Sequence, residues 1–209
     1  MFRGEHDIFS SNIEQIIPHP DYGTAWISVQ PIGSLYRLSY NDIALIRLKK
    51  PLIFNGTIHP ICLPAADEHQ LRSNAEFYVS GWGYTNVRVE EDGKITKTYG
   101  DILRHTLAVV RETAANPFAV TLLGERYSKE KLHSFSSNDS MPCNGDSGGP
   151  VMKQSNSNGY WFQYGIVSQG FRFGNKYICK DRSFVSYTRI TKYCAFIEAA
   201  TNGEVVCIE

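Results

Sequence analysis

The sequence predicts an all-β protein. Aromatic and β-branched residues are frequent and stand in short runs separated by Gly, Asn, Ser and Pro, which is typical of strands joined by turns. A chain of 209 residues can bury a substantial core, and all-β proteins of this size often form one unit. No apolar run approaches the length of a membrane span. We therefore expect a barrel or a sandwich of short strands.

The expected elements follow in chain order. Strand-like runs of apolar residues bounded by turn residues cover 43–48, 77–83, 102–110, 160–168 and 184–190. The charged stretch 84–100 is expected to form an exposed hairpin or loop, and 65–75 is polar and linker-like. A short helix is expected within 114–133, where Phe118 and Leu122 stand four residues apart. A second helix is expected over 191–200, with Thr191 as N-cap.

Charge and cysteines limit the function classes. Lys plus Arg and Asp plus Glu both number 21, so no net field favours nucleic acid or a membrane as partner. The five cysteines form no Cys-x-x-Cys pair, and we expect neither a metal nor a cofactor. The N-glycosylation triplets that begin at Asn55 and Asn138 indicate a secreted protein, although the first residues contain no signal peptide.

The stretch 144–151, Asn-Gly-Asp-Ser-Gly-Gly-Pro-Val, carries the clearest chemistry. Its glycines allow a tight turn with no Cβ in the way. Such a turn can aim the amides of Gly145 and Ser147 at one point, where a tetrahedral oxyanion needs donors. Asp146 is a charge that can lock the loop. Ser147 is therefore the candidate nucleophile.

This stretch resembles the nucleophile loop of the chymotrypsin/trypsin-like serine proteases. Segments around Asp42, Cys62, Trp82 and Ile166 resemble family segments in the same order, so the resemblance covers nearly the whole chain. It implies a double β-barrel with an incomplete first barrel and a C-terminal helix. The implied divisions are a first-barrel remnant at 1–64, an inter-barrel linker at 65–75, a second barrel with the nucleophile loop at 76–190, and the C-terminal helix and tail at 191–209.

The resemblance also assigns roles to residues. Ser147 is implied as nucleophile, Asp42 as the acid that orients a general base, and Gly145 and Ser147 as oxyanion donors. Asp146 is implied as the acid that pairs with the N-terminus freed on activation. A buried carboxylate without a partner is costly, so with no such N-terminus we expect Asp146 to stay solvated and the oxyanion hole to be poorly formed.

The family's general-base segment, Ala-Ala-His-Cys, has no counterpart here. The histidines are more typical of surface positions, and a base has to reach the serine hydroxyl within about 3 Å or through one water. His6 is the least unsuitable of them, and we do not assign it as base. The histidines considered are His6, His19, His59, His69, His105 and His133. The expectation is a chain truncated upstream of Met1, which does not hydrolyse peptides by itself.

The cysteines follow the same resemblance. It implies a Cys143–Cys179 disulfide bracing the specificity pocket, and a bond from Cys62 to a propeptide or upstream regulatory region. Cys194 and Cys207 are a third candidate pair, on sequence position alone. Phe77 and Lys153 occupy positions where many family members have another bridge.

The specificity pocket implied by the resemblance is apolar. Met141 stands where trypsin-like members carry an acid, Ser168 is followed by Gln169 in place of the usual Trp, and Gly170 leaves one wall open. Val185 replaces a glycine on the other wall. Such a pocket disfavours a basic substrate side chain, which would be buried unpaired.

Three function classes follow. The first is a secreted serine endopeptidase acting on protein or peptide substrates through an acyl-enzyme. The second is a non-catalytic homologue that uses the fold as a binding or cofactor module, which the altered pocket and absent bridges favour. The third is an unrelated all-β binding domain with a coincidental glycine loop, which the order of the matching segments disfavours.

Overall fold

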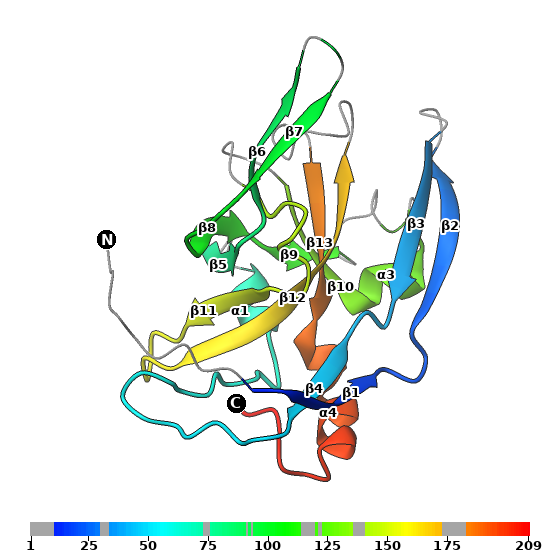
Figure 1. The fold of residues 1–209 in the computed structure, drawn as a ribbon. Helices are drawn as coiled ribbons and strands as arrows, with labels where there is room; N and C mark the ends of the chain where they lie inside the picture. Colours follow the sequence, from blue (N-terminus) through cyan, green and yellow to red (C-terminus); the bar gives the residue numbers. More distant parts are fainter. Residues whose placement is uncertain are drawn as a thin grey trace.

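The computed structural model describes residues 11–29, 34–72, 76–90, 92, 94–113, 120, 123–135, 141–172 and 183–209. The fold is mostly strands with few helices, as the sequence predicts, and the largest unit is a curled seven-stranded sheet (Figure 1). The strand order in this sheet is β8(Arg104–Val109), β5(Glu76–Gly81), β11(Pro150–Gln154), β12(Trp161–Arg172), β13(Ser183–Arg189), β10(Lys131–Phe135) and β9(Arg111–Glu112).

The sheet curls because its two edge strands are consecutive in the chain. Only Val110 separates β8 from β9, although the two strands stand at opposite ends of the hydrogen-bonded order. Apolar side chains alternate inward along the strands and fill the curled interior. The buried members of this core are Leu71, Phe77, Val79, Val110, Leu132, Val151, Phe162, Tyr164, Val167, Val185 and Tyr187. Phe77 and Lys153, named above as a lost bridge, do face each other, with Nζ 5.5 Å from the ring centre.

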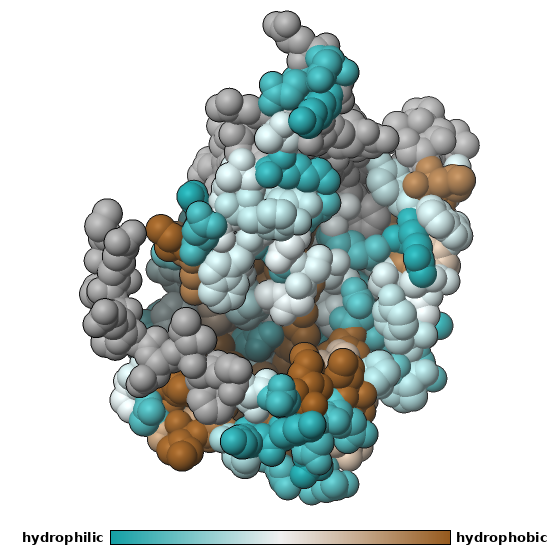
Figure 2. All heavy atoms as spheres, viewed as in Figure 1, coloured by the Kyte–Doolittle hydropathy of each residue, from teal (hydrophilic) through white to brown (hydrophobic). Residues whose placement is uncertain are grey.

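The first quarter of the chain forms two separate antiparallel pairs. β1(Ile13–Pro18) pairs with β4(Ala44–Leu48), and β2(Gly23–Val29) pairs with β3(Ser34–Tyr40). Apolar side chains of these pairs are exposed, and Figure 2 shows brown surface gathered near β1 and β4. Exposed apolar surface of this kind fits a first barrel that the described strands do not close. The large exposed side chains here are Ile13, Ile16, Trp26, Leu35 and Ile46.

The stretch 84–100 forms the expected hairpin. β6(Tyr84–Val89) and β7(Ile95–Tyr99) pair with each other and project from the sheet (Figure 1), and their visible surface is hydrophilic (Figure 2). At its base, the Tyr84 and Tyr99 hydroxyls lie 2.9 Å apart. The region 65–75 contains a short helix, α1(Glu68–Arg72). The helix expected within 114–133 is found as α3(Glu125–Glu130), whereas Phe118 and Leu122 lie outside the described residues.

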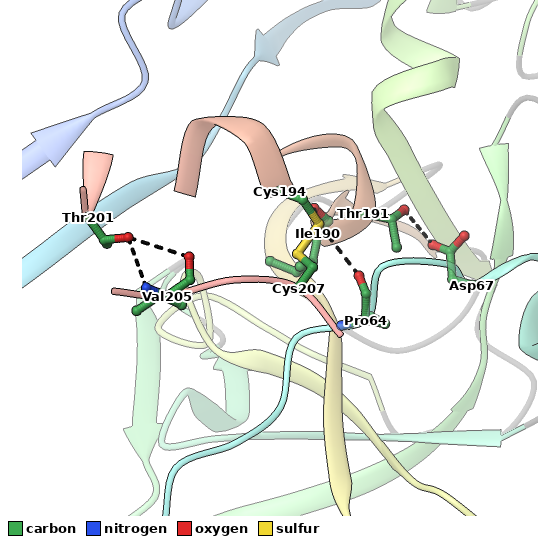
Figure 3. Close-up of a disulfide and its surroundings, with 8 residues drawn as sticks. All are labelled: Pro64, Asp67, Ile190, Thr191, Cys194, Thr201, Val205 and Cys207. Atoms are coloured by element: carbon green, nitrogen blue, oxygen red, sulfur yellow. Dashed lines mark hydrogen bonds between the residues drawn. A yellow bond between two sulfur atoms is a disulfide. The ribbon is translucent and has the colours of Figure 1, made fainter. Parts of the chain in front are cut away.

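The C-terminal helix is present but begins later than expected. η2(Ile190–Lys192) precedes α4(Cys194–Ala200), and Tyr193 occupies the N-cap position of α4. The N-cap prediction for Thr191 is therefore wrong. The Thr191 hydroxyl instead donates to Asp67 Oδ2 at 2.9 Å, as Figure 3 shows.

The candidate pair Cys194–Cys207 is confirmed as a disulfide (Figure 3), with a Cα–Cα distance of 5.7 Å. It brings the tail back to the segment that follows Cys62, where Ile208 donates to the Leu63 carbonyl at 2.8 Å. Cys143 is also disulfide-bonded, and its predicted partner Cys179 lies outside the described residues. Cys62 is a free thiol in this structure and is half-buried.

Candidate active site

The Ser147 loop is a tight turn that leads into β11. The Asp146 amide donates to the Cys143 carbonyl at 3.0 Å, and the Gly149 amide donates to the Asp146 carbonyl at 2.9 Å. Gly145 has φ +100°, a backbone conformation that side chains with a Cβ rarely adopt. Ser147 lies at the exposed tip of this turn. The loop geometry therefore presents the serine to solvent.

The amides of Gly145 and Ser147 are the proposed oxyanion donors. Within the part of the chain that the structure describes, neither amide donates to a protein acceptor. Two uncommitted amides two residues apart on a turn are able to receive an oxygen that develops negative charge.

Asp146 does not lie in solvent as expected. Its carboxylate is half-buried, and its two oxygens accept the amides of Gly83 at 2.7 Å and Cys143 at 2.8 Å. Hydrogen bonds from backbone amides satisfy a carboxylate without a cation, which is why this one tolerates partial burial. Asp146 thus fixes the loop to the glycine turn that follows β5.

Gly83 is required for this contact. An ideal Cβ on Gly83 would lie 2.5 Å from the Asp146 Cγ atom, far inside van der Waals contact. We expect Gly83→Ala to displace the carboxylate and to lower the free energy of unfolding by about 1–3 kcal/mol, because overpacking adds to a lost hydrogen bond.

Urea unfolding of Gly83→Ala measures this effect. Gly170→Ala is the matched control, because a Cβ there meets nothing within 4 Å. Equal stability losses in the two variants would contradict the role given to the Gly83 contact.

Asp42 stands between β3 and β4, directly after Asn41. Asn41 has φ +48°, a left-handed conformation that Asn tolerates better than most residues. The Asn41 amide donates to Glu130 Oε2 at 3.1 Å, and its side-chain nitrogen donates to the Asp21 carbonyl at 2.8 Å. Hydrogen bonds to Glu130 and to Asp21 therefore hold the bend before β4 in place. It turns the Asp42 carboxylate toward β12, where the Ser168 hydroxyl donates to Oδ2 at 2.6 Å.

One strand links the two candidate catalytic residues. Val167 exchanges two backbone hydrogen bonds with the Ser147 loop, accepting from Gly148 at 2.8 Å and donating to Gly149 at 2.9 Å. The next residue of β12 is Ser168, which bonds Asp42. β12 therefore brings together a nucleophile candidate and an acid candidate that are 105 positions apart in the sequence.

Comparison with known proteins identifies the family. The family model described as Trypsin matches residues 3–197. This chain belongs to the trypsin family. Among similar proteins, "CLIP domain-containing serine protease B15" of Anopheles gambiae is 36% identical over 191 residues, which are 89% of this chain and 45% of that protein.

Two further relatives agree with this assignment. "Clotting factor G beta subunit" of Tachypleus tridentatus is 28% identical, with 96% of this chain and 60% of that protein covered. "Vitamin K-dependent protein C" of Oryctolagus cuniculus is 28% identical, with 94% and 40% covered. The trypsin-family chain thus spans about half the length of the relatives it matches.

Two histidines of this trypsin-family chain pack on aromatic rings. The His19 ring lies edge-on to Tyr193, with 5.5 Å between ring centres. His133 is 3% exposed and stacks on Phe184 at 5.1 Å. Burial, with a contribution from the Arg111 charge, lowers the pKa of His133 to about 4, so its ring is neutral near pH 7.

The remaining described histidines lie at the surface. His59 is exposed, His69 lines a cavity of about 700 Å³ formed with the C-terminal tail, and His105 packs against Tyr78. His6 lies outside the described residues. Among the histidines that the structure describes, none hydrogen-bonds the aspartate carboxylate of the candidate site.

The predicted pocket residues divide into two groups. Met141 packs against the core that contains Val185, and Gly170 pairs with Val185 across β12 and β13. There is open space beside Gly170, where a Cβ would meet nothing within 4 Å.

Gln169 and Ser168 are committed to other contacts. The Gln169 side-chain amide donates to the Arg37 carbonyl at 2.6 Å and accepts the Ser39 amide at 2.8 Å, so it ties β12 to β3. Ser168 bonds Asp42, as described above. Both polar side chains therefore form hydrogen bonds within the protein.

Sequence reasoning missed Lys131. It is the first residue of β10 and is 0% exposed, and its Nζ donates to the hydroxyls of Ser168 and Thr188, each at 3.0 Å. No strand was predicted over 131–135, and four consecutive residues there are buried, so no alternation of side chains marked Lys131. Within the described residues, no group of three or more potential metal ligands is found, and no helix has the length and hydropathy to cross a membrane.

Proposed function

We propose that this chain carries the nucleophile and the orienting acid of a secreted serine endopeptidase, with Ser147 and Asp42 in these roles. The oxyanion donors are the Gly145 and Ser147 amides, and the substrate is a protein or peptide. The observation that carries the proposal is that both residues are held by neighbouring positions of β12, since Val167 bonds the Ser147 loop and Ser168 bonds Asp42. Membership of the trypsin family and relatives named as serine proteases support it.

We further propose that the 209-residue chain by itself does not hydrolyse peptides at an enzyme-like rate. A serine needs a base within hydrogen-bond reach to become a nucleophile. The described histidines support this part, because His19 and His133 are held by aromatic rings. Cys62 is proposed as the attachment point of a propeptide or upstream regulatory region.

Adding a base from solution tests this function. We expect imidazole to promote acylation of Ser147 by an activated ester, with a product burst that is absent in Ser147→Ala, because imidazole replaces only the missing proton acceptor. Esters of apolar amino acids should react about 100-fold faster than lysine esters, since the pocket residues Met141 and Val185 are apolar and offer a cation no partner. Burst amplitude and labelling by a serine-directed phosphonate are the measurements.

The outcomes separate the functions. Labelling of Ser147 without imidazole would contradict the proposed inactivity and confirm the protease. Absence of any Ser147-dependent burst, with the chain folded, would favour the non-catalytic homologue, a binding or cofactor module. That second candidate is supported by the Gln169 contacts to Arg37 and Ser39, which direct a candidate pocket side chain into the fold.

A further inference from the structure

Lys131 is a buried charge with unusual partners. Its side chain is 0% exposed, and its Nζ donates to two neutral hydroxyls, those of Ser168 and Thr188. Nζ also lies 5.5 Å from the centre of the Tyr127 ring. Among the described residues, Lys131 makes no direct ion pair with a carboxylate. A lysine placed only to stabilise the fold would be expected to pair with one.

The Ser168 and Thr188 hydroxyls, which accept hydrogen bonds from the Lys131 ammonium, each donate a second hydrogen bond to Asp42. The Ser168 hydroxyl donates to the carboxylate oxygen Oδ2 at 2.6 Å. The Thr188 hydroxyl donates to the Asp42 backbone carbonyl at 2.8 Å. Two hydrogen-bonded bridges thus connect Lys131 to Asp42, one through the Ser168 hydroxyl and one through the Thr188 hydroxyl.

The chemistry of the ammonium fixes the direction of these bridges. A protonated lysine has three donors and no acceptor, whereas a hydroxyl has one donor and can accept. While Lys131 is charged, Ser168 and Thr188 have to accept from it, and their protons are left for Asp42. A neutral amine has a lone pair, so it can accept from one hydroxyl and draw that proton away from Asp42.

We propose that Lys131 is a positioning residue for the site, whose ammonium directs the Ser168 and Thr188 hydroxyl protons onto Asp42. This inference rests on the proposed role of Asp42 as orienting acid. With the two protons directed at it, Asp42 is held in one orientation and kept as an acceptor for a base. Lys131 itself contacts neither substrate nor nucleophile in this role.

The surroundings allow the ammonium to lose its proton near physiological pH. Burial lowers the pKa of Lys131 to about 8, while the charges of Asp42 and Glu130 act in the opposite direction. Tyr127 and Tyr193, the other titratable groups on this side, have raised pKa values and remain neutral. β12 and β13 contribute only hydroxyls to the contact. The direction of the bridges can therefore change between pH 7 and pH 9.

NMR titration of the whole chain tests the bridge directly. We expect the Ser168 hydroxyl proton to be visible at pH 7 and to change with the same midpoint, near pH 8, as the ¹³C signal of Lys131 Cε. In Lys131→Met, a side chain of similar length without charge, that hydroxyl signal should show no such transition. In Thr188→Val, which keeps the shape and removes one acceptor, the Lys131 midpoint should move to lower pH. A Ser168 signal that does not follow Lys131 would overturn the inference.

The imidazole-dependent reaction gives a second readout. Ester turnover at Ser147 should fall by up to about tenfold between pH 7 and pH 9, as the charged fraction of Lys131 falls. The variant Lys131→Met should lack this fall. Identical pH profiles in the two proteins would reject the positioning role. Absence of Ser147-dependent turnover in both, with the NMR coupling intact, would instead reject the proposed function and leave the bridge established.

Discussion

Asp67→Ala is expected to lower the free energy of unfolding by about 3–5 kcal/mol, because it removes the buried carboxylate that makes a two-point contact with a buried guanidinium. Asp67 and Arg189 are 1% and 4% exposed. Arg189 Nε donates to Asp67 Oδ2 at 2.8 Å, and a second guanidinium nitrogen bonds the other carboxylate oxygen. This two-point contact is among the stronger hydrogen-bonded ion pairs available to a protein.

The size of the effect follows from what the pair connects. Asp67 directly precedes α1, and Arg189 ends β13. Arg189 also bonds Glu112 of β9 at 2.9 Å, so its guanidinium joins β13, β9 and the segment that carries Asp67. The Asp67 carboxylate also accepts the Thr191 hydroxyl (Figure 3). Removing Asp67 leaves Arg189 with Glu112, which is partly exposed and therefore a weaker partner.

Urea unfolding at pH 7 measures the loss. Glu14→Ala is the matched control, because the Glu14–Arg47 pair is 3.4 Å apart with side chains that are 52% and 63% exposed. Exposed pairs contribute about 0–1 kcal/mol. A loss for Asp67→Ala no larger than for Glu14→Ala would show that burial adds nothing to this pair.

The sequence predicted those features that depend on local pattern. The runs at 77–83 and 184–190 were found as β5 and β13 because alternating apolar residues between turn residues are sufficient to specify a strand. The Ser147 loop was found because its glycines encode the turn itself. Cys194 and Cys207 were matched because they are separated by 13 positions, a distance that a small loop can close.

Features that depend on distant partners were missed or wrong. Thr191 has the residue type of an N-cap, but its hydroxyl bonds Asp67, which is 124 positions away. Asp146 was expected in solvent because its candidate partner was an N-terminus, whereas backbone amides of Gly83 and Cys143 satisfy it. Amides leave no trace in residue type, so no reading of side chains could have found them.

Lys131→Met is expected to raise the free energy of unfolding at pH 7 by about 3 kcal/mol. The folded-state pKa of about 8 lies below the ordinary value of 10.5, so folding disfavours the charged form. Each unit of this difference corresponds to about 1.4 kcal/mol. Lys131 therefore destabilises the folded chain at pH 7, and a neutral side chain of similar length removes that cost.

The pH dependence has a definite sign. Between pH 8 and pH 10.5 the unfolded chain still binds the proton that folded Lys131 has released, so the stability of the wild type rises through this window relative to the variant. The advantage of Lys131→Met should accordingly shrink as the pH is raised. Urea unfolding of both proteins at pH 7 and pH 10 measures this, with Lys129→Met, a change at an exposed lysine of α3, as control for the substitution. A variant that is less stable than wild type at pH 7 would show that Lys131 serves the fold. A more stable variant that has lost the coupling to Ser168 would mean that Lys131 orients Asp42 at a cost in stability.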